Sequence, residues 1–220
     1  MIRNTVFCVV TIVCLLVSNL CFSGDPEWNP GVIVLEDNQV LAGDLKYDHK
    51  NGVIQCRDAG KIKAFSSHGV TSFHFINGST NILHRYVSVE QKTGENYRRK
   101  EFFEIVLEGE LTILRKRNKS TDPVRRGHTL STDNLMHHIL CYEYYVYHQG
   151  EMVKVNKFKK DVVPLMKDKK REIISYADKK NLKLYYLMDQ ISLISYYNGL
   201  IYAENGKPQK SLSYYLPRKF

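Results

Sequence analysis

Recognisable catalytic motifs are missing from this sequence. It contains no G-x-S-x-G elbow, no H-E-x-x-H pair, no P-loop and no G-x-G-x-x-G turn. Each of these motifs positions a nucleophile, a metal ion or a phosphate, so their absence argues against the commonest hydrolases, metalloproteases and nucleotide-binding enzymes. The sequence therefore favours a protein without catalytic activity and indicates no cofactor.

Cysteine is scarce, and three of the five cysteines lie within the first 23 residues. Cys56 and Cys141 remain in the rest of the chain. In an oxidising compartment they could form one disulfide that closes a long loop, which would stabilise the fold by roughly 3–5 kcal/mol. Two separate buried thiols are the equal alternative, because a chain of this length can bury an adequate core without a disulfide.

A convincing set of metal ligands is also lacking. The candidate ligands are the adjacent pair His137 and His138, with His128 and His148 nearby. Adjacent histidines on a strand point to opposite faces, and on a helix they diverge by about 100°, so they seldom bind the same ion. We predict no metal site.

Paired carboxylates of the kind that cleave glycosidic bonds are represented only by Glu104, Glu108 and Glu110. Two of these acids flank the tip of a predicted hairpin, where charged residues are ordinary. Hydrolysis would require two carboxylates that converge on one cleft, and the sequence does not indicate such a cleft.

The first residues have the pattern of a secretory signal peptide. Residues 1–23 contain one early cation, Arg3, followed by an apolar run from Val6 to Leu20, with a cleavage point before Gly24. A retained membrane anchor and lipidation at Cys21 are the alternatives, and we favour cleavage because the apolar run is short for a bilayer span. The pattern predicts an exported protein, periplasmic or at the cell surface, with no transmembrane span once the leader is removed.

The stretch from Phe102 to Lys116 is the clearest structural feature. Two apolar runs meet at Glu108-Gly109-Glu110, which is typical of a β-hairpin with a short charged tip. Strict alternation predicts that one face of this hairpin carries Phe103, Ile105, Leu107, Leu111 and Ile113.

Residues 24–155 predict an antiparallel β-rich region. Strand-like segments of about five residues alternate with turns such as Asp37-Asn38, Asn51-Gly52 and Asn77-Gly78. This spacing is typical of a sandwich or an open barrel. Together with the helical pattern that follows, it predicts an α+β fold: a β-rich sandwich or open barrel, then a short C-terminal helical unit.

Residues 156–200 predict helices that pack on the sheet. Asn156 and Asp168 are candidate N-caps, and Pro164 should end, kink or restart the helix there. The clearest helix is expected over 184–198, with Asn198-Gly199 as its C-terminal stop. Residues 201–220 are expected to form a loose tail.

Positive charge dominates the chain, with 32 Lys and Arg against 23 Asp and Glu and a net charge of +9. Residues 151–220 hold 15 of these cations against 7 acids. Two further basic clusters flank the central hairpin and form a candidate anion-binding patch of Arg98, Arg99, Lys100, Arg115, Lys116 and Arg117. Such cations can equally protect an edge strand from aggregation or form a solvated face. The partner they would suit is an anionic envelope polymer or a lipid surface; no nucleic-acid motif is present.

A resemblance extends over most of the chain after the leader. The segments that carry it include GVIVLEDN at 31–38, VLAGDLKY at 40–47, GKIKAF at 60–65, VTSFHF at 70–75 and FFEIVLEGELTILR at 102–115. In their order they resemble a family of uncharacterised exported bacterial proteins with a small β-rich domain and short C-terminal helices. The resemblance implies fold and export, and it transfers no catalytic residue.

Together these observations predict an exported, non-catalytic binding or structural module of the periplasm or cell surface. The alternative is a hydrolase that acts on an envelope polymer. A deep cleft lined by converging acids, or by His and Cys, would favour the hydrolase.

Overall fold

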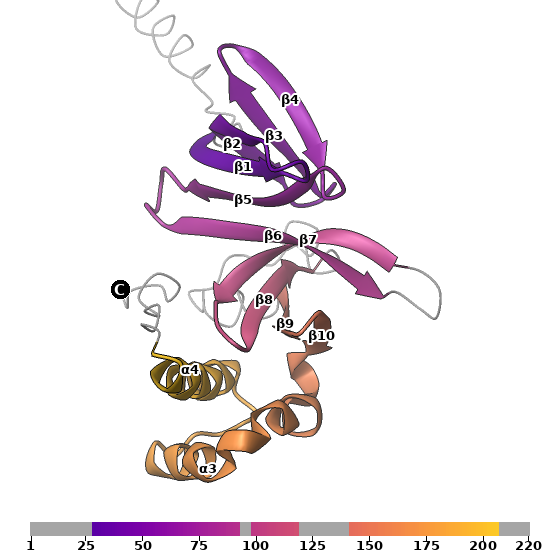
Figure 1. The fold of residues 1–220 in the computed structure, drawn as a ribbon. Coiled ribbons are helices and arrows are strands. Elements are labelled where there is room, and N and C mark those ends of the chain that lie inside the picture. Colours follow the sequence, from indigo (N-terminus) through magenta and orange to yellow (C-terminus); the bar gives the residue numbers. More distant parts are fainter. Residues whose placement is uncertain (1–27, 93–97, 119–140, 207–220) are drawn as a thin grey trace, which may run out of the picture.

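The computed structural model describes residues 28–92, 98–118 and 141–206 (Figure 1). The predicted leader at 1–23, most of the predicted tail, and His128, His137 and His138 lie outside the described residues.

Within these described residues, ten strands form a single sheet in which every neighbouring pair is antiparallel. Their order across the sheet is β10-β9-β8-β7-β6-β5-β1-β2-β3-β4. The strands are β1 (Asn29–Leu35), β2 (Val40–Asp48), β3 (Val53–Asp58), β4 (Lys61–Ser66), β5 (Val70–Ile76), β6 (Leu83–Lys92), β7 (Arg98–Leu107), β8 (Thr112–Arg117), β9 (Tyr142–His148) and β10 (Glu151–Lys154).

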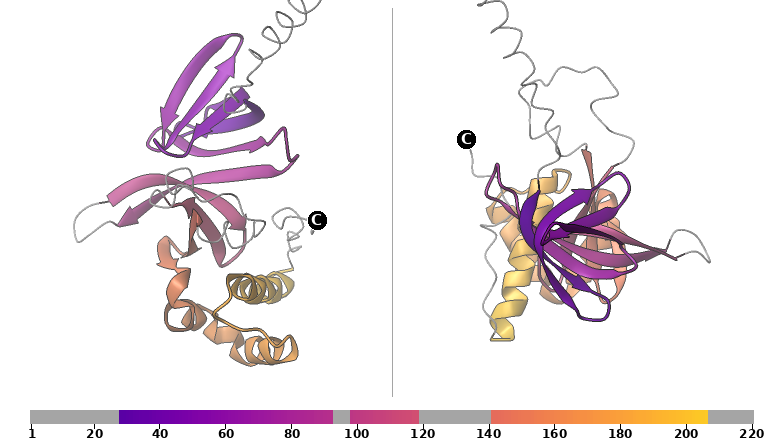
Figure 2. Two further views of the ribbon diagram at one scale, coloured as in Figure 1. Left: turned by 180° about the vertical axis from the view of Figure 1, so that it is seen from behind. Right: turned by 90° about the horizontal axis from the view of Figure 1, so that it is seen from above.

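A helical unit follows the last strand. It consists of the short helices η2 (Val155–Lys157), η3 (Phe158–Val162) and η4 (Val163–Lys169), then α3 (Lys170–Lys179) and α4 (Leu187–Glu204). Figures 1 and 2 show this unit beside the β8–β10 end of the sheet, away from β1–β5. The arrangement confirms the predicted α+β class, with an antiparallel β-rich region followed by a short C-terminal helical unit.

The core is divided along the sheet. One cluster fills the β1–β7 part and contains Ile33, Leu45, Ile54, Cys56, Val70, Phe73, Phe75, Tyr86 and Phe102. A second cluster joins the β7–β10 end to the helices, through residues such as Leu111, Ile113, Val146, Phe158, Ile191 and Ile194. The described helices therefore pack on the end of the sheet that carries the central hairpin.

The central hairpin is confirmed, but the predicted face for its tip is wrong. Ile105 lies opposite Leu114, whereas Leu107 lies opposite Ile113, so Val106 is an extra residue on β7. Such a β-bulge reverses the alternation, and opposed residues share a face. Leu107 and Ile113 accordingly pack toward the helices, on the other face from Ile105.

The helical predictions need three corrections. Neither Asn156 nor Asp168 caps a helix, because no helix in this segment has a side-chain cap. The expected stop at Asn198-Gly199 is also wrong, since α4 continues to Glu204. Pro164 does lie where one helix ends and the next begins, as predicted, at the start of η4.

Candidate functional site

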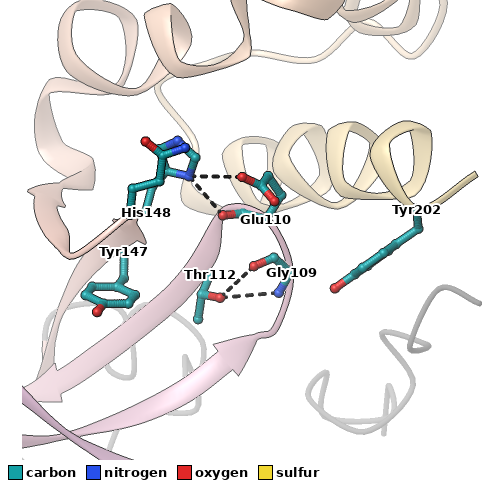
Figure 3. Close-up of a pocket in the computed structure, with 7 residues that line it drawn as sticks. Gly109, Glu110, Thr112, Tyr147, His148 and Tyr202 are labelled. Carbon is teal, nitrogen blue, oxygen red and sulfur yellow. Dashed lines mark hydrogen bonds and ion pairs between the residues drawn. The ribbon is translucent and has the colours of Figure 1, made fainter. Parts of the chain in front are cut away.

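An open groove lies at the tip of the central hairpin, where the hairpin meets the β9–β10 turn and the C-terminal half of α4 (Figure 3). Its volume is about 360 Å³, within the usual range for small-ligand sites. The groove is lined by Gly109, Glu110, Thr112, Tyr147, His148, Gln149 and Tyr202. Three segments distant in the sequence thus contribute to a single concave surface.

The floor of the groove is held by a buried asparagine on α4. The backbone N–H of Leu111 donates to Oδ1 of Asn198 at 2.9 Å, and Nδ2 of Asn198 donates to the carbonyl of Leu111 at 3.0 Å. Asn198 is only 1% exposed, so both bonds are shielded from water. One amide side chain therefore takes the place of a neighbouring strand for Leu111, just before β8 begins.

Gly109 permits this contact. A Cβ atom at Gly109 would lie 2.2 Å from Nδ2 and 2.4 Å from Cγ of Asn198. Any larger residue at this position would displace the amide or the hairpin tip. Glycine is therefore required at this position by the close approach of α4, and not only by the turn.

The Thr112 side chain forms hydrogen bonds within the hairpin tip. Its hydroxyl donates to the carbonyl of Gly109 at 2.9 Å and accepts from the Gly109 N–H at 3.3 Å (Figure 3). The hydroxyl lines the groove while its hydrogen bonds hold the loop. The tip is thus held by hydrogen bonds of its own side chain.

His148 is oriented by Glu110. Nδ1 of His148 lies 3.1 Å from the carbonyl oxygen of Glu110 and 3.5 Å from its carboxylate Oε1 (Figure 3). Both partners are acceptors, so Nδ1 carries a proton and Nε2 of the neutral ring is left as an acceptor. The groove thus offers donors and acceptors together with the rings of Tyr147 and Tyr202.

Of the three candidate acids, only Glu110 lines the groove. Glu108 forms an ion pair with Arg85 at 2.6 Å. Glu104 lies inside the protein with His84 and Arg115. The carboxylates therefore do not converge on the groove in the way that glycoside hydrolysis requires.

Glu104 is the centre of a buried ionic cluster. His84 Nδ1 lies 2.8 Å from Oε1, and Arg115 donates to both carboxylate oxygens at 2.7 and 2.9 Å. Burial raises the pKa of Glu104, but the His84 hydrogen bond and the Arg115 charge outweigh it and lower this pKa to about 2. The guanidinium of Arg115 also stacks on Tyr142 at 4.5 Å. The carboxylate of Glu104 is thus compensated inside the sheet by His84 on β6 and Arg115 on β8.

Five of the six residues in the candidate anion-binding patch are paired with acids. Arg98 pairs with Glu90, Arg99 and Lys116 with Glu101, Lys100 with Glu36, and Arg115 with Glu104. The sixth, Arg117, is exposed at the end of β8. Arg99, Lys100 and Lys116 do meet, around a cavity of about 70 Å³ that Glu101 shares. Carboxylates thus already compensate most of this positive charge.

Cys56 and Cys141 are not joined by a disulfide in the structure. Cys56 is buried in β3, whereas Cys141 is half-buried just before β9, and six strands separate β3 from β9 in the sheet. This arrangement favours the alternative of two separate thiols over a disulfide. Burial, reinforced by nearby Asp58, raises the pKa of the Cys56 thiol and lowers its reactivity.

Among the residues that the structure describes, no three His, Cys, Asp or Glu side chains are grouped as metal ligands would be. Nor does any helix in those residues combine the length and apolarity needed to cross a bilayer.

Sequence reasoning missed most of the groove. The sequence pattern gives no functional role to Gln149 and places Tyr202 in the expected tail at 201–220. One signal could have found the groove: Asn198 falls on the apolar stripe of its helix, and a buried amide needs hydrogen-bond partners. The identity of those partners, 87 residues away, is not readable from the pattern.

No protein-family model, curated protein or solved structure matches this chain.

Proposed function

We propose that this protein is an exported, non-catalytic binding module. Its ligand is a short hydroxyl-rich segment, such as an oligosaccharide of the cell envelope, that occupies the groove at the hairpin tip. The leader pattern at residues 1–23 supports export. The observation that carries the binding role is the groove itself, which combines two tyrosine rings with hydroxyl, amide, imidazole and carboxylate groups around a hydrogen-bonded loop.

The chemistry of the lining residues suits a sugar. Tyr147 and Tyr202 provide flat apolar faces with a polar end, which can contact the C–H face of a pyranose while their hydroxyls stay hydrated. Thr112, Gln149 and Glu110 provide acceptors and donors for hydroxyl groups. The groove is open, so a segment of a longer polymer could enter without a free end.

The arrangement of the carboxylates favours a binding role over a hydrolytic one. Among the described residues, Glu110 is the one carboxylate in the lining, and it interacts with His148. The two carboxylates of a glycosidase normally flank the bond that they cleave. A ligand held here would be retained rather than cut.

The test is a titration of the purified protein with soluble oligosaccharides released from the envelope of the producing cell. Amide NMR signals of Gly109, Thr112 and Gln149 should shift, and the Tyr202→Ala variant should bind roughly tenfold more weakly, as expected for loss of one aromatic contact. Tyr185→Ala is the matched control, because Tyr185 is an exposed tyrosine outside the groove. Equal weakening in both variants, or shifts confined to other regions, would refute the proposal.

A further inference from the structure

Two adjacent tyrosines are strongly exposed in the turn that joins α3 to α4. Tyr185 is 68% exposed and Tyr186 is 54% exposed, and their ring centres lie 4.1 Å apart. Most other tyrosines in the described residues are buried or half-buried. A pair of aromatic rings that contact mainly each other and water has a cost that packing within the protein does not offset.

Three lysines surround this pair in the sequence. Lys179, Lys180 and Lys183 are exposed, and none forms an ion pair in the part of the chain that the structure describes. In this they differ from the candidate patch on β7 and β8, where five of six cations have a carboxylate partner.

The two acids near the turn reduce this charge only in part. The carboxylate of Asp189 accepts the backbone N–H of Lys183 at 2.7 Å, so it is directed into the turn, whereas Asp178 is exposed. The surrounding helical unit is also basic, with 10 Lys and Arg against 6 Asp and Glu over residues 155–206. A local cluster of lysines therefore lies within a wider positive field.

We propose that this turn docks the protein on an anionic lipid bilayer, with Tyr185 and Tyr186 at the headgroup level and the three lysines against acidic headgroups. Tyrosine is enriched at membrane interfaces because its ring is apolar and its hydroxyl is polar. Lysines next to such rings are attracted by the surface potential of acidic lipids. Charge complementarity and exposed interfacial rings thus meet on one short segment.

The position of the turn leaves the groove accessible. Tyr186 precedes the first residue of α4 and Tyr202 lies near the helix end, so a rise of about 1.5 Å per residue separates them by roughly 24 Å. A bilayer at the N-terminal end of α4 would not cover the hairpin tip. Experiments can therefore refute membrane docking without refuting ligand binding in the groove, and the reverse.

The test is flotation of the purified protein with vesicles of phosphatidylcholine alone or mixed with phosphatidylglycerol. We expect binding only to the mixed vesicles, with weakening at high salt. The triple variant Lys179→Gln/Lys180→Gln/Lys183→Gln should bind roughly 100-fold more weakly, because each lysine near an acidic surface contributes about fivefold. The matched control Lys50→Gln/Lys61→Gln/Lys63→Gln removes the same charge from exposed positions around β3 and β4 and should bind like the wild type.

A second variant tests the rings separately. Tyr185→Ser/Tyr186→Ser keeps every charge and should still lower vesicle binding. Tyr185→Trp in a Trp28→Phe background should show a blue-shifted fluorescence that brominated lipids quench. Equal losses in the two lysine variants, or no effect of the tyrosine changes, would overturn the proposal. Salt-sensitive binding to a soluble anionic polysaccharide without binding to vesicles would also overturn it, because the partner would then be a polymer.

Discussion

Asn198 and Leu111 are 87 residues apart in the sequence, yet a single side-chain amide satisfies both backbone groups of Leu111. This contact joins α4 to the central hairpin in a buried position. The helix continues past Asn198-Gly199 to Glu204, and the Asn198 side chain faces the hairpin tip from within it.

Replacement of Asn198 by Ala should destabilise the protein by about 2 to 4 kcal/mol, because it leaves a buried N–H and a buried C=O without partners. Urea unfolding at neutral pH measures the loss. Asn205→Ala is the matched control at the exposed end of the same helix and should change stability little. If both variants unfolded at the same urea concentration, the contact would not contribute to stability.

Gly109→Ala should also be destabilising, because its methyl group would overlap the Asn198 amide. In the Asn198→Ala background the same change should cost much less, since the overlapping group is gone. A double-mutant cycle on unfolding free energies measures this coupling. Gly69→Ala is the control, because its nearest neighbouring atom would lie 3.9 Å away. Strictly additive effects at Gly109 and Asn198 would contradict the predicted overlap.

Because of Glu104, the free energy of unfolding should decrease at acid pH. Its pKa is about 2 in the folded protein and 4.5 as a free group, so the folded state binds its proton less readily. The resulting stabilisation, of about 3 kcal/mol, is complete above pH 4.5 and is lost as the pH falls to about 2.

The Glu104→Gln variant should lose this pH dependence, and at neutral pH it should be less stable, because the buried Arg115 charge loses its partner. Unfolding free energies measured across the acid range provide the comparison. Glu151→Gln, which removes an exposed carboxyl on β10, should keep the wild-type slope. If the Glu104→Gln variant lost as much stability at acid pH as the wild type, other groups would be responsible for that loss.

His49 should produce a second, separate dependence of stability on pH. Burial, with repulsion from Arg117, lowers its pKa from 6.5 to about 4, and its ring lies 4.2 Å from that of Tyr47. The unfolded chain therefore binds this proton first, and stability should decrease as the pH falls from 6.5 towards 4.

Histidine NMR signals test this directly, and the His49 signal should titrate near pH 4. His49→Phe should flatten the stability profile between pH 6.5 and 4, whereas His68→Gln, at an exposed position, should not. Titration of His49 near pH 6.5 in the folded protein would contradict the prediction.

Cys56 and Cys141 should both react as thiols. Without reductant, denatured protein that lacks residues 1–23 should show two thiols per chain by Ellman titration, and folded protein should protect Cys56 because it is buried. The Cys56→Ala variant should lose the protected thiol alone. A denatured protein with no reactive thiols would indicate the disulfide instead.

Much of the β-region was predictable because its signals are local. Alternation of side chains and the turns at Asp37-Asn38 and Asn51-Gly52 depend on neighbouring residues; Asn38 and Gly52 adopt the positive φ that such turns require. Strand pairing between neighbours in the sequence follows from short connections, which is why β1 with β2 and β7 with β8 were expected.

The sequence by itself determined the antiparallel sheet, the change to helices after residue 155 and the break at Pro164, because periodicity and turn chemistry act over a few residues. Only the tertiary structure decided the bulge at Val106, the length of α4 and the groove. These depend on Asn198 meeting Leu111 and on Tyr202 reaching the hairpin, and contacts between distant segments leave no periodic signal in the chain. The same reason explains the cationic patch: its residues were visible, but Glu36, Glu90 and Glu101 compensate it only once the strands are paired.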